Sequence, residues 1–297
     1  MMNLSTALSF AFLGIIWGTN FIFMRWASEL ITPMQIVFLR VLFGFIPIIC
    51  IACWYKVFDR SHLRFLCHFT VMALLATVIY YWAFASGTSL LMSGISGVLS
   101  GCIPLFAFLM AALFLKDEVI NAKRLMGVTL GFIGVVIIAR PWAVAGQGVS
   151  LAGVGYMILG SISVGGSFVY AKKYLANVNI RPLALTSYQI GIALLILTLI
   201  TPFDGMGALF SDSASALGLV FGLGLLGTGG AYLTYYYLIL KLGAITASSV
   251  TYVPPVVALI VGYLFANESI GYPEIFSMLL ISMGVFLLQH RVKAKQR

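Results

Sequence analysis

The chain has 297 residues, of which 62% are hydrophobic and 8% are charged, and its mean hydropathy is +1.08. Soluble domains carry about 25% charged residues, so this sequence has too little polar surface to form a soluble globule. The net charge of +9 does not indicate nucleic-acid binding either, because the basic residues stand at the ends of apolar segments and not on one folded face.

Ten apolar segments, each bounded by charge, Pro or Gly, run through the chain. The N-terminus, Met1–Phe10, lacks the basic region and cleavage site of a signal peptide, so we expect a retained first span. The runs are continuously apolar and do not alternate as barrel strands would, which predicts an all-α, multi-pass membrane protein. At about 20 residues per span, no room remains for a large soluble domain. The predicted helices lie near 5–26, 33–53, 66–87, 92–115, 124–140, 151–172, 183–202, 215–238, 245–265 and 271–290.

The basic residues predict the orientation. If the N-terminus starts inside, fourteen of the seventeen Lys and Arg residues fall on the cytoplasmic side, and only Arg25, Arg40 and Arg140 do not. Such a bias in short loops sets the topology of membrane proteins. We therefore expect both termini in the cytoplasm and a location in the bacterial inner (plasma) membrane.

The sequence repeats itself after 150 residues. In this register three residues of different types match three others at the same spacing: Pro104, Glu118 and Gly134 fall on Pro254, Glu268 and Gly284. The repeat predicts two five-helix domains, 1–145 and 146–290, followed by a basic tail, 291–297. Because five is odd, the second copy enters the membrane from the opposite side, and such inverted pairs are typical of transporters with a substrate site near the midplane.

The sequence resembles a known family over nearly its whole length. Ser93–Glu118 is similar to the fourth helix of EamA-type proteins in the drug/metabolite transporter superfamily, and Tyr236–Glu268 resembles its equivalent in the second repeat. W-G-T-N-F at Trp17–Phe21 and Arg40 in the second span are also similar. The resemblance implies a ten-helix carrier that exports or exchanges small metabolites through a cavity lined by helices 1 to 4 and 6 to 9. The resemblance does not identify the transported solute.

Aromatic and small polar side chains gather in particular spans and predict a polar, aromatic-lined cavity. Each of them alone could equally be a helix contact or an interfacial anchor. The predicted substrate-binding residues are Trp17, Asn20, Arg40, Tyr80, Tyr81, Trp82, Ser100, Ser167, Gln189, Tyr232, Tyr236 and Tyr252. Pro104, Pro254 and Pro255 remove backbone donors in spans four and nine, and we interpret these kinks as candidate hinges.

Arg40 is the one charge well inside a predicted span. A buried cation usually faces a cavity or a partner, so Arg40 either binds a substrate carboxylate or pairs with Glu29 or backbone carbonyls. At an offset one residue smaller than 150, Pro33–Arg40 lies over Pro182–Gln189, so the repeat equivalent of Arg40 is Gln189 and a full charge breaks the symmetry of the two halves.

Two motifs have simpler interpretations than cofactor sites. Gly222–Gly227 matches the dinucleotide fingerprint G-x-G-x-x-G but lies inside span eight, where glycines serve helix packing. The same applies to Gly14/Gly18, Gly97/Gly101, Gly127/Gly131 and Gly218/Gly222. Cys50 and Cys53 form a lone C-x-x-C in an apolar helix, so we expect free thiols and no metal. No cofactor is predicted.

These observations favour a secondary carrier for a small polar or amphipathic metabolite, preferably an amino acid. All eight carboxylates fall at span ends or in loops, which disfavours an intramembrane enzyme and a buried proton relay. A non-transporting protein, such as a lipid scramblase or a scaffold subunit, is the alternative. The expected partners are a small-molecule substrate and the lipid bilayer, without nucleic acid, and a homodimer stays open.

The topology can be tested by cysteine labelling. A membrane-impermeant reagent applied from outside should modify a cysteine placed at Ser211, in the predicted external loop 203–214, and should spare one placed at Lys295. The reverse pattern would overturn the orientation and the inverted repeat with it.

Overall fold

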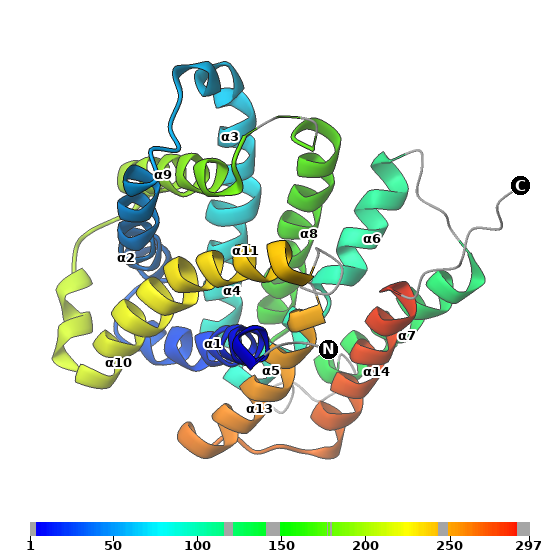
Figure 1. Ribbon diagram of the computed structural model, residues 1–297. Coiled ribbons are helices and arrows are strands. Elements are labelled where there is room, and N and C mark those ends of the chain that lie inside the picture. Colours follow the sequence, from blue (N-terminus) through cyan, green and yellow to red (C-terminus); the bar gives the residue numbers. More distant parts are fainter. Residues whose placement is uncertain are drawn as a thin grey trace, which may run out of the picture.

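The computed structural model describes residues 4–289 except 116–120, 141–148, 177, 179 and 243–248. In these residues it forms a bundle of helices without a strand (Figure 1). Eight helical segments are long and apolar enough to cross a membrane, and two shorter apolar helices follow. The all-helical fold is therefore confirmed. The count of ten spans and the orientation stay predictions.

The first half contains five helical segments, of which the first, second and fifth are the single helices α1 (Leu4–Ser28), α2 (Pro33–Trp54) and α7 (Ala122–Ala139). The third segment joins the short 3₁₀ turn η1 (Arg60–Phe65), α3 (Leu66–Ala73), η2 (Leu74–Val78) and α4 (Ile79–Leu90). The fourth joins α5 (Ser93–Ser100) and α6 (Ile103–Phe114). The third segment, predicted as one regular helix, widens into a π-helix at η2. The fourth breaks at Gly101 and Cys102, immediately before the predicted Pro104 kink.

The second half follows the same order. Its elements are α8 (Leu151–Tyr174), α9 (Pro182–Ile200), η3 (Met206–Ser211), α10 (Ser213–Leu217), η4 (Gly218–Gly230), α11 (Ala231–Leu242), η5 (Ser249–Tyr252), α13 (Val253–Phe265) and α14 (Tyr272–Gln289). The segment equivalent to the third span again contains a π-helix, η4. The predicted helix 245–265 starts among residues outside the described part, so only η5 and α13 represent it.

Local sequence signals start several helices. Thr32 and Gln35 form a capping box with Pro33 at the first turn of α2, and the Gln35 amide also donates to the carbonyls of Pro202 and Asp204 at 2.7 and 2.8 Å. Asp212 caps α10: the hydrogen bond from Ser215 lowers the pKa of its carboxyl. These caps define where α2 and α10 begin, which the apolar pattern of the sequence alone does not specify.

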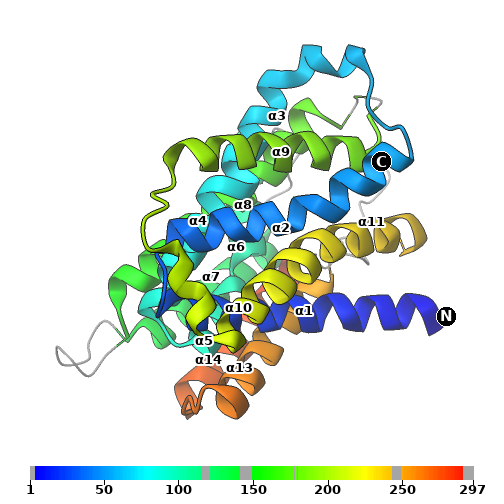
Figure 2. The ribbon, with the colours of Figure 1, turned by 90° about the vertical axis from the view of Figure 1, so that its left-hand side faces the viewer.

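Helices of one half pack mainly on helices of the other. α7 lies along α14 at one edge of the bundle, α5 crosses α13, and α2 packs on η4 (Figure 1). From the side, α9 lies beside α2, and α11 continues from η4 below them (Figure 2). The edge position of α7 and α14 agrees with the scarcity of polar residues in the predicted spans five and ten.

Glycines allow the closest helix contacts, as the sequence predicted. A Cβ built on Gly284 of α14 would lie 2.5 Å from the Gly127 carbonyl oxygen and 2.9 Å from the Gly131 amide of α7. Gly14 and Gly18 of α1 face Val253 and Val257 in the same manner. The small-residue spacing in these spans therefore serves helix packing.

Polar contacts join residues that the topology assigns to the same face. The Arg25 guanidinium donates to the Ser89 carbonyl at 2.8 Å, and Arg140 forms an ion pair with Glu274. Glu274 is 6% exposed, so one of the carboxylates predicted at span ends is buried and neutralised by its partner. Glu118, the repeat counterpart of Glu268, lies outside the described residues.

The α7–α14 contact gives a stability test. Gly284→Ala should lower the free energy of unfolding by about 1–3 kcal/mol, because the added methyl group collides with the backbone of α7. Gly155→Ala is the matched control, since a Cβ at Gly155 meets nothing within 4 Å. Thermal unfolding of both variants in detergent measures the difference. Equal melting temperatures would contradict the packing described.

Candidate functional site

The buried guanidinium of Arg40 is the centre of the candidate site. Arg40 lies on α2 and is 6% exposed. Its Nε donates to the hydroxyl of Thr228, on η4 of the other half, at 3.1 Å. The same hydroxyl donates to the Leu223 carbonyl at 2.9 Å, five residues back along η4. The π-helix thus supplies a hydroxyl that is oriented to accept from Arg40.

Two residues of α1 complete the polar shell. With its amide oxygen turned toward Arg40, Asn20 accepts from Nη2 at 3.3 Å, while its nitrogen donates to the Ile16 carbonyl at 3.0 Å. This orientation satisfies both ends of the buried amide. Nη1 lies 4.0 Å from the Met24 sulfur, a weak contact. A Cβ on Gly227 would collide with Asn20, so the glycine of η4 makes room for the amide.

Aromatic rings cover the guanidinium. Its central carbon lies 3.9 Å from the centroid of the Tyr81 ring, an arrangement that attracts a cation to the π face. Tyr80 packs against Tyr81 and Phe84, with ring centroids 5.0 and 4.6 Å apart. Of the predicted site residues, Arg40, Asn20, Tyr80 and Tyr81 therefore come together.

No carboxylate neutralises Arg40 among the described residues. Glu29, the structural partner considered from the sequence, lies beside Arg25 instead, with 3.8 Å between the charged atoms. Each guanidinium nitrogen of Arg40 has one contact, which leaves one N–H on each terminal nitrogen without a partner in the described residues. Among the described residues, Arg40 is thus a buried cation with free donors and no neutralising anion.

Gln189 makes the equivalent contact in the other half. Its Nε2 donates to the Thr77 hydroxyl at 3.0 Å, and both residues are buried. Thr77 belongs to the π-helix η2, as Thr228 belongs to η4. The bond from α2 to the eighth span is therefore matched by a bond from α9 to the third span.

A sequence signal for this pairing exists but was not used in the sequence analysis. Leu74–Thr77 reads L-L-A-T and Leu225–Thr228 reads L-L-G-T, 151 residues later, and in this register Tyr81 falls on Tyr232. Thr77 and Tyr81 are four residues apart on one span, and neighbours at this spacing share a helix face. Arg40 thus contacts Thr228 and Tyr81, and Thr77, on the same span as Tyr81, is bonded to Gln189; we call these five residues the polar line.

Several other predicted site residues make contacts outside this polar line. Trp17 packs on Tyr235, with centroids 5.7 Å apart, in a separate apolar cluster. Trp82 contacts Tyr156 of α8 at 5.5 Å. Ser100 and Ser167 donate to carbonyls of their own helices, and Tyr232 packs against the main core. The side chain of Tyr236 lies outside the described residues.

The predicted hinge prolines meet where the two broken helices cross. Pro104, Pro255 and Tyr252 line one small gap of about 10 Å³, and Pro254 is buried beside them on α13. The Tyr252 hydroxyl has no hydrogen-bond partner within the described residues. The break at Gly101 also faces Pro255, since a Cβ built on Gly101 would lie 3.4 Å from the Pro255 Cγ.

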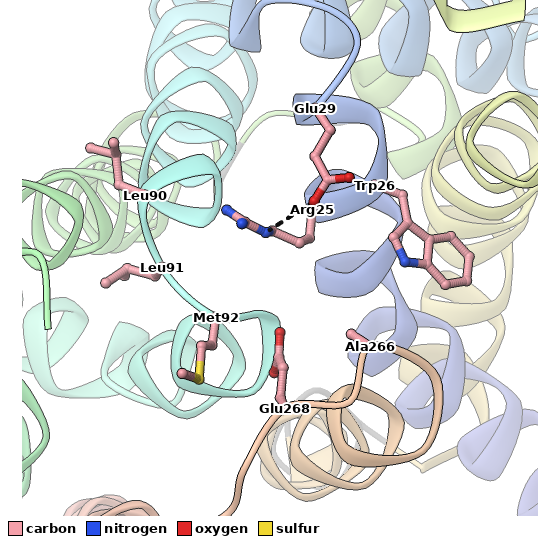
Figure 3. Close-up of a pocket in the computed structure, with 8 residues that line it drawn as sticks. All are labelled: Arg25, Trp26, Glu29, Leu90, Leu91, Met92, Ala266 and Glu268. Carbon is pink, nitrogen blue, oxygen red and sulfur yellow. Dashed lines mark ion pairs between the residues drawn. The ribbon is translucent and has the colours of Figure 1, made fainter. Parts of the chain in front are cut away.

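A larger cavity lies elsewhere and was not predicted. About 400 Å³ opens between the end of α1, the α4–α5 connection and the α13–α14 connection, with Arg25, Glu29 and Glu268 at its walls (Figure 3). Glu268 accepts from the backbone amides of Ser93 and Gly94 at 2.5 and 2.8 Å. Span ends that are distant in sequence form this cavity, so no local pattern indicated it.

Metal chemistry has no ligand set in the described part of the chain, where no group of three or more His, Cys, Asp or Glu residues is close enough to hold an ion. Cys50, Cys53 and Cys67 are exposed free thiols, and Cys102 is a buried one.

The comparisons with known proteins agree with this architecture. The profile of the EamA-like transporter family matches residues 4–140 and again 151–289. The chain belongs to the EamA-like transporter family. It is a multi-pass membrane transporter, and a transporter is not an enzyme.

Its relatives carry equally general names. An uncharacterized transporter of Archaeoglobus fulgidus is 23% identical over 92% of this chain and 94% of its own, and the uncharacterized transporter YoaV of Bacillus subtilis is 24% identical over 92% of both. The uncharacterized inner membrane transporter YedA of Escherichia coli is 27% identical over 66% of this chain and 63% of its own. A crystal structure with 18% identity covers 96% of both chains with a TM-score of 0.57, which supports the fold.

The two equivalent hydrogen bonds should differ in strength. Thr228→Val leaves a charged donor unpaired and should cost about 1–3 kcal/mol, whereas Thr77→Val leaves a neutral amide and should cost less. Thr228→Ser retains the hydroxyl and is the matched control. Thermal unfolding in detergent provides the comparison. A Thr228→Val protein as stable as the Thr228→Ser protein would show that the bond contributes nothing.

Proposed function

We propose that this EamA-like protein is a secondary carrier for a small carboxylate-bearing solute, preferably an amino acid, and that it works by alternating access. The observation that carries the proposal is the buried guanidinium of Arg40, which has free donors and no anion among the described residues. A carboxylate on the solute would provide the missing charge.

The energetics favour a ligand as the partner. A buried charge without a counter-ion is costly, and membrane proteins tolerate it mainly along substrate pathways. Guanidinium presents planar pairs of N–H donors that match a carboxylate, and the Tyr80 and Tyr81 rings provide apolar surface for the rest of the solute. Thr228, Asn20 and Tyr81 hold the guanidinium in place, so its free donors are oriented before the solute arrives.

The arrangement of the halves supports alternating access. Two inverted repeats, 1–145 and 146–290, with both termini in the cytoplasm of a bacterial cell, would rock about a site between them. The paired bonds Arg40–Thr228 and Gln189–Thr77 and the meeting of Pro104 with Pro255 fit two structurally equivalent halves. Export or exchange is the expected mode.

Substitutions at Arg40 test the carrier. Counterflow in proteoliposomes should be at least tenfold lower in Arg40→Gln than in the parent for leucine, which carries a carboxylate, and much less reduced for leucinamide, which lacks it. Arg40→Lys should give an intermediate value, because an ammonium lacks the bidentate geometry.

The control separates recognition from folding. Arg181→Gln removes an exposed positive charge from another part of the chain and should leave counterflow unchanged. Melting temperatures and folded yields are measured for each variant. A folded Arg40→Gln protein with the parent's preference for leucine over leucinamide would remove Arg40 from the binding site. Lipid flip without solute counterflow would favour a scramblase.

A further inference from the structure

The cavity between the ends of α1, α4 and α13 has the construction of a binding site. Its walls come from both halves: the last turn of α1, the connection from α4 to α5, and the connection from α13 to α14. Its volume, about 400 Å³, exceeds that of a free amino acid several-fold and falls in the range typical of small-molecule sites. Charged groups and apolar side chains line it together (Figure 3).

The Arg25 guanidinium is held in place, but within the described residues not all of its N–H donors form hydrogen bonds. Nη1 donates to the Ser89 carbonyl at 2.8 Å, which orients the group across the cavity. Nε lies 3.8 Å from the Glu29 carboxylate, beyond hydrogen-bond distance. Within the described residues Nη2 has no partner, so Arg25 can still donate to a ligand anion.

Two carboxylates provide the opposite charge. The Glu29 side chain is 63% exposed, and its one ion pair within the described residues is the long contact with Arg25. Glu268 is held rigidly, because its two oxygens accept from the amides of Ser93 and Gly94 at the start of α5. Its carboxylate faces the cavity (Figure 3), and each oxygen retains a lone pair for a further donor.

Apolar residues lie on either side of these charges. Leu90 and Met92 are 47% and 44% exposed at the wall formed by the α4–α5 connection. The indole of Trp26 lies on the opposite side, across Arg25 (Figure 3). One positive and two negative groups therefore line the same cavity, a combination that repels a simple anion and suits a molecule carrying both charges.

We infer that this cavity is a second solute site, which binds a zwitterionic amino acid with an apolar side chain. The ligand carboxylate accepts from Arg25, its ammonium group is attracted by Glu29 and Glu268, and its side chain packs toward Trp26. Arg25 follows Asn20, the neighbour of Arg40, by five residues of α1, or about 7.5 Å along the helix. The second site therefore lies further along α1 than the Arg40 site. The inference rests on the proposed function only in taking the ligand to be the transported solute.

Binding of leucine and two analogues tests the chemistry. Isopentylamine lacks the carboxylate and 4-methylpentanoate lacks the ammonium group. Tryptophan fluorescence of the purified full-length protein should respond to leucine, and the response should disappear in Trp26→Phe and persist in Trp17→Phe. Equilibrium dialysis with radiolabelled leucine gives the affinity independently. The two analogues should each bind at least tenfold more weakly than leucine.

Substitution of a carboxylate tests whether it binds the ammonium group of the ligand. Glu29→Gln should weaken leucine binding about fivefold, as expected for a largely exposed ion pair, and should not weaken binding of 4-methylpentanoate. Asp204→Asn removes an exposed carboxylate from a loop that does not line the cavity, and should leave leucine binding unchanged. Equal binding of leucine and 4-methylpentanoate, or equal leucine affinity in Glu29→Gln and the parent, would overturn the inference.

The two proposals fail in different ways. Leucine counterflow that needs Arg40 but is accompanied by no Trp26 response and no effect of Glu29→Gln would overturn the second site and leave the carrier intact. A Trp26 response to leucine in a parent protein that shows no leucine counterflow would support the second site and remove the carrier.

Discussion

The buried guanidinium of Arg40 is the constraint on which the centre of this bundle depends. Its Nε bonds to Thr228, so α2 and η4 must approach closely, and Gly44 permits this by leaving room for the threonine side chain. Asn20 reaches the same guanidinium from α1 because Gly227 has no side chain. Spans one, two, three and eight therefore meet around one charge, and replacing either glycine would force them apart.

The two halves share one architecture but differ in charge. Arg40 bonds to Thr228, and Gln189 bonds to Thr77, each across the boundary between the halves and each to a π-helix. The extra residue in a π-turn is retained in proteins mainly at functional positions, because it weakens the helix. Because both halves share one backbone architecture, each can adopt the conformation of the other, which rocking requires. The single charge of Arg40 orients the solute, because it attracts the carboxylate end.

Much of the fold was predictable because it follows from composition and period. Long apolar runs identify the spans, and the sequence repeat alone pairs Arg40 with Gln189. The π-helices were missed because hydropathy does not distinguish i→i−4 from i→i−5 hydrogen bonding. The cavity at Arg25, Glu29 and Glu268 was missed for another reason: three connections far apart in sequence form it, and each charge alone looks like an ordinary helix end.

Solute binding at Arg40 would also explain how the halves are released. A ligand shifts a conformational equilibrium only through contacts that differ between the two states. Arg40 now bonds to Thr228 of η4 and to Asn20 of α1, which links its own span to two others. A carboxylate that accepts from the free N–H donors neutralises the guanidinium, and this weakens the charge-assisted bonds to Thr228 and Asn20. Neutralising the charge and loosening the contact between α2 and η4 would then be one event, which couples the presence of solute to the movement that carries it.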